Sequence, residues 1–268
     1  MLDFGSGPLV MGILNITPDS FSDGGLYLDR NDAVEHGCRM ALQGADIVDV
    51  GAESTRPGSL PVPPLEQIER MVPVIEALSE RADAIISVDT TSAEVAEAAI
   101  GAGAEMINDV SALSDPGMAP LAARAGVPLV LMHMQGNPKT MQERPMYDDV
   151  IQEVYTFLEQ KVREAVLLGV PEGRIIIDPG IGFGKRLEDN LLLISRIAEF
   201  RWIGCRVMLG HSRKSFLGEL TGIQEPFMRE TGTHAVTALS SGSVDIFRVH
   251  DVEGTRQVLK VSRKLGFE

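Results

Sequence analysis

Eight short apolar segments recur along the chain, and they constrain its fold more than any other feature. Each is rich in Val, Ile and Leu and apolar on both sides, a pattern typical of parallel strands that are covered on both faces. The segments are Leu9–Thr17, Asp46–Gly51, Ala84–Thr90, Glu105–Ala112, Val127–Met134, Arg174–Gly180, Cys205–Ser212 and Asp245–Val252.

Helical patterns lie between these segments. Two of them begin on capping residues, Asn31 and Ser92, and three longer ones span Asp148–Gly169, Leu187–Phe200 and Val252–Gly266. Eight strands that alternate with helices in about 250 residues indicate a (β/α)₈ (TIM) barrel. An open, doubly wound parallel sheet is the structural alternative. We find no linker, low-complexity stretch or charge block, so we expect a single domain over residues 1–268.

Composition narrows the class of partner. The chain of 268 residues has a formal net charge of −14, which argues against nucleic acid and anionic membranes as partners. A small anionic substrate stays compatible with this charge, because it needs only a local cationic cluster. No apolar run approaches the roughly 20 residues of a membrane span. The two cysteines, Cys38 and Cys205, are far apart and no signal peptide is evident, so we expect a cytoplasmic protein.

Polar residues end nearly every predicted strand. In a barrel these ends form the active-site mouth. Any one such residue could simply begin a turn, but Arg248 and His250 share a strand face and need an anion or an open mouth opposite them. Asp and Asn side chains together suit a flat ring with an amino group beside a ring N–H, and cations suit a phosphate or carboxylate. The candidates are Asn15, Thr17, Asp89, Asn108, Asp109, His133, Asp178, His211, Arg213, Lys214, Arg248 and His250.

Two loops rich in Gly or Pro, Thr17–Gly25 and Glu53–Pro64, follow the first two strands and are candidate lids, the second because it carries Arg56. The glycine-rich "GIGFGK" is not a phosphate-binding loop, because no Ser or Thr follows Lys185. The stretch "LMHMQGNPKTMQ" contains one His, so we expect packing there rather than a metal cluster.

The motifs "MGILNITPDSFSDGG", "DVGAESTRPG", "SVDT", "INDVSA", "LMHMQGNPKTMQ", "IIDPGIGFGK", "GHSRKSFLG" and "RVHDV" together resemble dihydropteroate synthase of folate biosynthesis. The resemblance runs in order from Val10 to Val252. The first, second and seventh motifs are specific to that family, whereas those of strands three, four and six are shared with other pterin-binding barrels.

The resemblance implies a transferase that condenses 6-hydroxymethyl-7,8-dihydropterin diphosphate with 4-aminobenzoate to give 7,8-dihydropteroate and pyrophosphate. It implies Mg²⁺ as cofactor, with Asn15 near the metal, sulfonamides as inhibitors and a homodimer formed through the late helices. No protein nucleophile is needed, because pyrophosphate can leave to give a resonance-stabilised dihydropterin cation that the arylamine attacks.

Matching positions then carry implied roles. The catalytic group would be Asn15, Lys214, Arg248 and His250, with the last two and Asn15 holding the diphosphate. The pterin would be bound by Asp89, Asn108, Met132, Asp178, Phe183, Lys214 and Arg248. The aminobenzoate site and its loops would use Phe21, Asp23, Thr55, Arg56, Pro57 and Ser215.

Two other functions are compatible with part of this pattern. One is a pterin-binding methyltransferase domain that acts on methyltetrahydrofolate with a corrinoid protein, which shares the Asp and Asn residues but has no use for "STRPG", "SRKS" or "RVHD". The other is a non-catalytic paralogue that binds pterin without turning it over.

Overall fold

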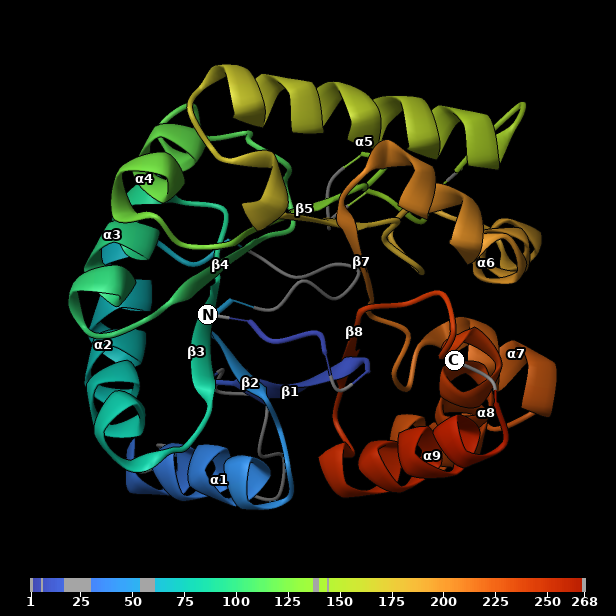
Figure 1. The fold of residues 1–268 in the computed structure, drawn as a ribbon, viewed down its shortest axis with the longest axis horizontal. Helices are drawn as coiled ribbons and strands as arrows, with labels where there is room; N and C mark the ends of the chain where they lie inside the picture. The colour runs from blue at the N-terminus through green and yellow to red at the C-terminus, as the bar shows by residue number, and fades with distance from the viewer. Residues whose placement is uncertain are drawn as a thin grey trace.

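The chain folds into a closed barrel of eight parallel strands with helices around it, which confirms the (β/α)₈ prediction and excludes the open sheet. The computed structural model describes residues 2–5, 7–16, 30–53, 61–136, 140–143 and 145–266. The strands follow one another in chain order, and β1 closes the barrel by pairing with β8 (Figure 1). They are β1 (Leu9–Asn15), β2 (Ile47–Gly51), β3 (Ile85–Asp89), β4 (Met106–Asp109), β5 (Leu129–Met132), β6 (Ile175–Asp178), β7 (Arg206–Leu209) and β8 (Ile246–Val249).

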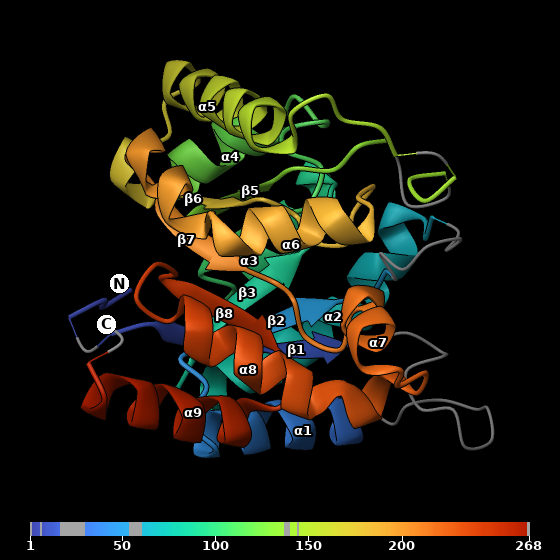
Figure 2. The same ribbon diagram turned by 90° about the vertical axis from the view of Figure 1, so that its right-hand side faces the viewer.

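The helices lie on the outside of the barrel, as Figures 1 and 2 show. They are α1 (Arg30–Leu42), α2 (Pro64–Arg81), α3 (Ala93–Gly101), α4 (Met118–Ala125), α5 (Val150–Leu167), α6 (Leu187–Ser195), α7 (Ser215–Thr221), α8 (Glu230–Ser240) and α9 (Val252–Lys264). Short 3-10 helices occur at Glu172–Arg174, Ile197–Ile203 and Pro226–Arg229. Within the described parts of the chain, no helix is long and apolar enough to cross a bilayer.

The helix boundaries only partly match the predictions. Ser92 caps α3 as expected, with its side chain accepting a hydrogen bond from Val95 N at 3.5 Å. Asn31 was predicted as a cap but lies one residue inside α1, which begins at Arg30. The sequence pattern missed α2, α4, α7 and α8. In α2, Pro64 is the first helical residue, where its fixed φ suits a helix start, and Pro73 interrupts the pattern further on.

The core has two parts. The larger part fills the space between the outer faces of the strands and the surrounding helices. The smaller part lies inside the barrel and consists of Leu9, Met11, Ile47, Met106, Val130, Ile176, Met208 and Ile246. Leu2 and Phe4 pack against this inner cluster, and the guanidinium carbon of Arg206 lies 4.5 Å from the ring centroid of Phe4. The N-terminal end of the barrel is therefore apolar, and polar side chains concentrate at the other end.

Candidate active site

The barrel interior changes from apolar to polar toward the carboxyl ends of the strands. Alternate residues of a strand face the same side, so the residue two places after an interior one also points inward. That residue is polar on five strands: Asp49 after Ile47, Ser87 after Ile85, Asn108 after Met106, Asp178 after Ile176 and Arg248 after Ile246. Asp49, Asn108 and Asp178 are at most 3% exposed. Buried polar groups of this kind need partners, and Asp49 is a partner of both Asn108 and Arg248.

Arg248 of β8 reaches past β1 to carboxylates on β2 and β3. Its Nε donates to Asp49 Oδ2 at 2.7 Å, and its Nη2 donates to Asp89 Oδ2 at 2.6 Å. Asn108 Nδ2 donates to the same Asp49 oxygen at 3.0 Å. Burial alone would lower the pKa of Arg248, but the charges of Asp49 and Asp89 raise it above its ordinary value. The arginine is therefore held as a cation at the centre of the mouth.

Asp89 is a buried carboxyl at the rim with a strongly raised pKa. Burial raises the pKa of Asp89 to about 7; Arg248 opposes the shift, and the charges of Asp49 and Glu53 add to it. Asp89 and Asn108 are register partners on β3 and β4, so the carboxylate and the amide lie side by side. Adjacent carboxylate and amide oxygens can accept several N–H groups from one edge of a planar ring.

Asp178 and Lys214 form the opposite side of the mouth. Asp178 ends β6, and its Oδ1 accepts a hydrogen bond from Gly180 N at 2.7 Å. Burial raises the pKa of Asp178, and the charge of Lys214 opposes that shift. Burial lowers the pKa of Lys214 to about 7. The Lys214 ammonium lies 4.3 Å from the centroid of the Phe183 ring and also donates to Ile181 O, so it lies against the glycine-rich loop after β6.

The glycine-rich loop at residues 180–184 requires its glycines for close backbone packing. Gly180 has a φ of +69°, and a Cβ there would lie 1.9 Å from His133 O. Gly184 has a φ of +64°, and a Cβ would lie 2.4 Å from Gln135 O. Side chains cannot be placed at either position without moving the neighbouring loop. The motif is thus explained by contact with the β5–α5 loop, which agrees with its rejection as a phosphate-binding loop.

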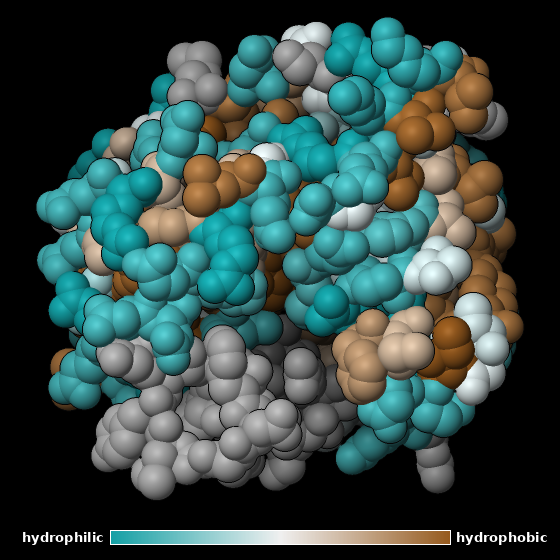
Figure 3. Space-filling model, turned by 90° about the horizontal axis from the view of Figure 1, so that it is seen from below, coloured by the Kyte–Doolittle hydropathy of each residue, from teal (hydrophilic) through white to brown (hydrophobic). Residues whose placement is uncertain are grey.

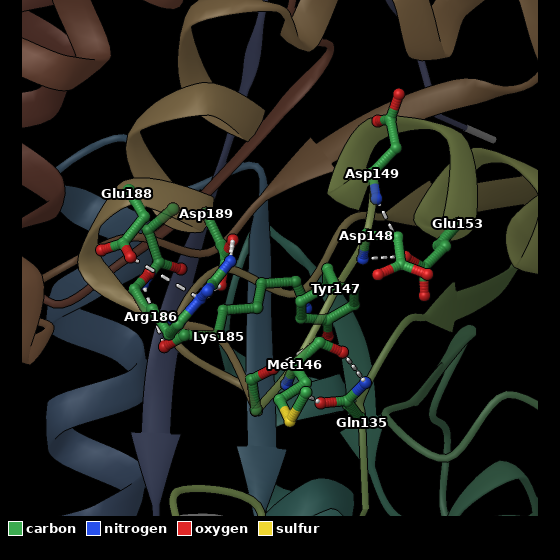
Figure 4. Close-up of polar contacts among 12 residues, drawn as sticks. Gln135, Met146, Tyr147, Asp148, Asp149, Glu153, Lys185, Arg186, Glu188 and Asp189 are labelled. Atoms are coloured by element: carbon green, nitrogen blue, oxygen red, sulfur yellow. Dashed lines mark hydrogen bonds and ion pairs between the residues drawn. The ribbon is translucent and has the colours of Figure 1, made fainter. Parts of the chain in front are cut away.

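Side-chain contacts brace each of these two loops (Figure 4), and the contact from Tyr147 to Gly184 joins them. Gln135 accepts from Met146 N at 3.0 Å and donates to Met146 O at 2.8 Å. Tyr147 Oη donates to Gly184 O at 2.8 Å, and Arg186 pairs with Asp189 at 2.7 Å. Phe183 is therefore presented at the mouth by a loop that is fixed on both sides.

Four strand-end residues that were predicted to face the mouth are used elsewhere. Asp109 accepts from Ser111 and Leu113 in its own turn. His133 packs edge-on against Phe157 of α5, with ring centroids 4.9 Å apart. The predictions for Asp109 and His133 were wrong because each comes directly after a residue that points into the barrel. Successive residues of a strand point to opposite sides, so these two side chains point toward the helices.

The other two corrections concern the segment after β7. His211 is fully buried and its Nε2 lies 3.0 Å from Thr233 O on α8. Arg213 pairs with Glu230 at the start of α8. Both residues therefore fasten α8 to the barrel.

The remaining described candidates lie at the same end of the barrel. His250 directly follows β8, and its Nδ1 lies 2.9 Å from Ser212 Oγ. Ser215 is the exposed first residue of α7. Asn15 ends β1 beside Gly51. Met132 ends β5, buried, in register with Asp178. Thr17, Phe21, Asp23, Thr55, Arg56 and Pro57 lie outside the described residues.

Two residues of the site were missed by the sequence reasoning. Asp49 contacts both Arg248 and Asn108, and its alternation with Ile47 in "DIVDVG" was the available signal. Lys185 is buried, with its Nζ 3.0 Å from His133 Nδ1 and 3.1 Å from Phe183 O. Burial lowers the pKa of Lys185 to about 7, and burial followed by the Lys185 charge lowers that of His133 to about 3. No sequence signal distinguished this lysine from a surface one.

A search of the described residues for three metal-ligating side chains finds Glu230, His234 and Asp251, whose ligand atoms lie within 4.8 Å of one another. These groups already have partners. Glu230 pairs with Arg213, and His234 Nε2 lies 3.1 Å from Asp251 Oδ2. Asp251 also caps α9 by accepting from Gly254 N. The cluster therefore fits an ion-pair network that joins α8, α9 and the β7–α7 loop.

Comparison with known proteins identifies relatives of this chain by sequence. Residues 11–250 match the sequence profile of a family described as pterin binding enzyme. The dihydropteroate synthase of Escherichia coli K12 is 45% identical over 257 residues, which are 96% of this chain and 91% of that protein.

Solved structures give the same result. The dihydropteroate synthase of Yersinia pestis in complex with a sulfonamide drug is similar with a TM-score of 0.94 at 41% identity, covering 100% of this chain and 97% of that one. The dihydropteroate synthase of Xanthomonas albilineans with 4-aminobenzoic acid has a TM-score of 0.91 at 45% identity, covering 97% and 93% of the two chains.

Proposed function

The chain belongs to the dihydropteroate synthase family of pterin-binding enzymes, and from this premise we propose how its barrel performs the reaction. The reaction joins 6-hydroxymethyl-7,8-dihydropterin diphosphate to 4-aminobenzoate and releases pyrophosphate. The observation that carries the assignment is the buried set of Asp89, Asn108 and Asp178 with the cations Lys214 and Arg248 at the mouth. A flat, donor-rich ring with an anionic substituent matches that set.

The pterin lies between the two sides of the mouth in this proposal. Asp89 and Asn108 accept N–H groups from one edge of the ring, and Asp178 accepts from the other side. Lys214 donates to the ring carbonyl, and Phe183 and Met132 line the slot. The support is positional: Asp89 and Asn108 are adjacent in register, and Met132 and Asp178 are adjacent in register.

Arg248, His250 and Asn15 hold the diphosphate. Arg248 keeps its charge because Asp49 and Asp89 raise its pKa. We propose Mg²⁺ as the cofactor, held by the Asn15 side-chain oxygen together with substrate phosphate oxygens. A neutral oxygen donor fits this hard cation, which binds proteins through few ligands when phosphate supplies the rest. The ion would neutralise charge that develops on the departing pyrophosphate.

The aminobenzoate site combines Ser215 with residues of the two predicted lid loops. Ser215 begins α7 directly after Lys214, so it follows the proposed pterin-binding lysine in the chain. Phe21, Asp23, Thr55, Arg56 and Pro57 complete the site in this proposal, and Arg56 supplies a cation for the carboxylate. Sulfonamides share the arylamine and an acidic group, so the same site would bind them; the related Yersinia pestis structure contains such a drug.

Catalysis then consists of positioning and electrostatics. The carbon–oxygen bond to the diphosphate breaks, the bonding electrons leave with pyrophosphate, and the dihydropterin cation is attacked by the arylamine nitrogen, which then loses a proton. Asp89, Asn108 and Asp178 place acceptors around the cationic ring, in a site that excludes most water. Buried charges act more strongly there than in solution.

We further propose that residues 1–268 act as one pterin-binding domain and that the chain forms a homodimer through α8 and α9. A groove between these helices exposes Leu239 (81%), Val261 (58%) and Leu265 (68%). Figure 3 shows apolar surface on the α9 side of this face, whereas the α1 side is mostly hydrophilic. A patch of this kind suits a protein interface. Both cysteines, Cys38 and Cys205, are free thiols, which supports a reducing, cytoplasmic location.

The test is pyrophosphate release from the pterin diphosphate, measured with and without 4-aminobenzoate. We expect release to require both substrates and Mg²⁺, with stoichiometric formation of dihydropteroate. Pterin binding without release would identify a non-catalytic paralogue. Methyl transfer from methyltetrahydrofolate to a corrinoid would identify the methyltransferase alternative, which the similarity to synthases does not favour.

A further inference from the structure

Asp49 is the one carboxylate of the described barrel interior that contacts two of the proposed pterin-binding residues and has no assigned role of its own. It is fully buried, and its Oδ2 accepts from both Arg248 Nε and Asn108 Nδ2. Its register partner on β3 is Ser87, whereas Asp89 and Asn108 are paired one interior level closer to the mouth. Asp49 therefore lies beneath the layer that would contact the ring.

The contact with Asn108 determines how that amide is oriented. An ionised carboxylate only accepts hydrogen bonds, so Asn108 has to turn its NH₂ group toward Asp49. Its carbonyl oxygen is then left for another group, and Asn108 Oδ1 is buried with no hydrogen-bond partner among the described residues. Because Asn108 is the register partner of Asp89 at the rim, this buried acceptor is within reach of a ligand donor.

The contact with Arg248 has a related effect. Arg248 is shared between Asp49 and Asp89, so it keeps one carboxylate partner when Asp89 accepts an N–H from a ligand. Without Asp49, the arginine would depend on Asp89 alone and would compete with the ligand for it. A buried cation that loses a partner is strongly disfavoured, so this competition would weaken binding.

We infer, given the pterin-binding function proposed above, that Asp49 is a positioning residue that sets the acceptor polarity of Asn108 and frees Asp89 for the pterin. It contributes to specificity for rings that present N–H donors at this edge. Asp49→Asn keeps the size of the side chain but can donate as well as accept, so the Asn108 amide could turn over and Asp89 would be held more tightly by Arg248.

The experiment compares two ligands by calorimetry: 6-hydroxymethylpterin, and 6-hydroxymethyllumazine, in which a carbonyl oxygen replaces the 2-amino donor. In Asp49→Asn we expect pterin affinity to fall at least about tenfold, or about 1.4 kcal/mol, and lumazine affinity to fall much less. The ratio of pterin affinity to lumazine affinity would therefore fall. A merely structural role would weaken both ligands equally, and that result, or unchanged pterin affinity in the folded variant, would overturn the inference.

Ser87→Ala is the matched control, because Ser87 is the buried register partner of Asp49 and its hydroxyl has no hydrogen-bond partner among the described residues. We expect it to leave both affinities and their ratio unchanged. If Asp49→Asn does not fold, Asp49→Asn/Arg248→Met removes both members of that ion pair and is compared with Arg248→Met, because Asp89 loses its arginine partner equally in both variants. A narrowed pterin preference in the double variant supports the inference, and an unchanged preference rejects it.

Measurements on the wild-type protein distinguish a failure of this inference from a failure of the proposed function. If wild type fails to bind the pterin or to release pyrophosphate, the proposed function is wrong. If wild type does both and only the variant comparison fails, Asp49 alone has been misassigned.

Discussion

Asp178→Asn tests the pterin site most directly. Asp178 is 3% exposed at the end of β6, and its Oδ1 accepts from Gly180 N at 2.7 Å. Asparagine has the same shape and can still accept this hydrogen bond through its carbonyl oxygen, so the glycine-rich loop should keep its structure. The substitution removes the negative charge and turns one acceptor toward the ligand into a donor.

The expected loss follows from the type of bond that is removed. A hydrogen bond to a charged group contributes about 1.5–3 kcal/mol, which corresponds to a roughly 10- to 150-fold weaker pterin affinity. A second effect acts in the same direction. The charge of Asp178 raises the pKa of Lys214 against burial, which lowers it to about 7. Without that charge the pKa of Lys214 falls further, and less of the lysine is protonated at neutral pH.

Calorimetry with a pterin that lacks the diphosphate measures the affinity, and thermal unfolding reports whether the barrel is intact. The pH dependence of binding gives a further readout, because the loss should be greatest between the further lowered pKa of Lys214 in the variant and about pH 7, where this lysine is protonated in wild type only. Unchanged affinity in a folded Asp178→Asn protein would refute the assignment of Asp178 to the pterin edge.

Three other outcomes are expected. Chelation of Mg²⁺ should abolish turnover and leave binding of a pterin without diphosphate nearly intact; equal loss of both would indicate a structural metal. Sulfonamides should bind tightly only with pyrophosphate and Mg²⁺ present, and Arg56→Ala should harm aminobenzoate use far more than pterin binding; equal sulfonamide affinity in titrations with and without pyrophosphate would reject a site completed by the loops. Burial raises the pKa of Asp89 to about 7, whereas the same carboxyl in the unfolded chain titrates near pH 4. Between about pH 4 and 7 the native state therefore keeps a proton that the unfolded chain has lost. Wild type therefore loses stability from this group as the pH rises through that window, and Asp89→Asn does not. In denaturant titrations, the free energy of unfolding of Asp89→Asn minus that of wild type should rise over the same window. A difference that does not change with pH would contradict the raised pKa.

The order of strands and most of the residues proposed to bind the pterin could be predicted from local pattern. Continuous apolar runs specify strands that are buried on both faces, and a strand-end position specifies the end of the barrel at which a residue lies. Asp89, Asn108, Asp178 and Arg248 were found in this way, and the structure brings all four to one mouth. Local pattern was weaker for helices, since prolines obscured α2.

The tertiary structure decides whether a strand-end side chain points into the barrel or toward the helices. It also decides which residue that side chain contacts. Asp109, His133, His211 and Arg213 are as polar and as close to strand ends as the site residues, yet they bind their own turns, α5 or α8. Asp49 stands inside an apolar run, and only closure of the barrel brings it to Arg248, 199 residues away in sequence. The sequence by itself determines residue type and period, because these act through neighbours along the chain. The pairing of buried charges depends on strand register around a closed barrel, and that register exists only in the folded protein.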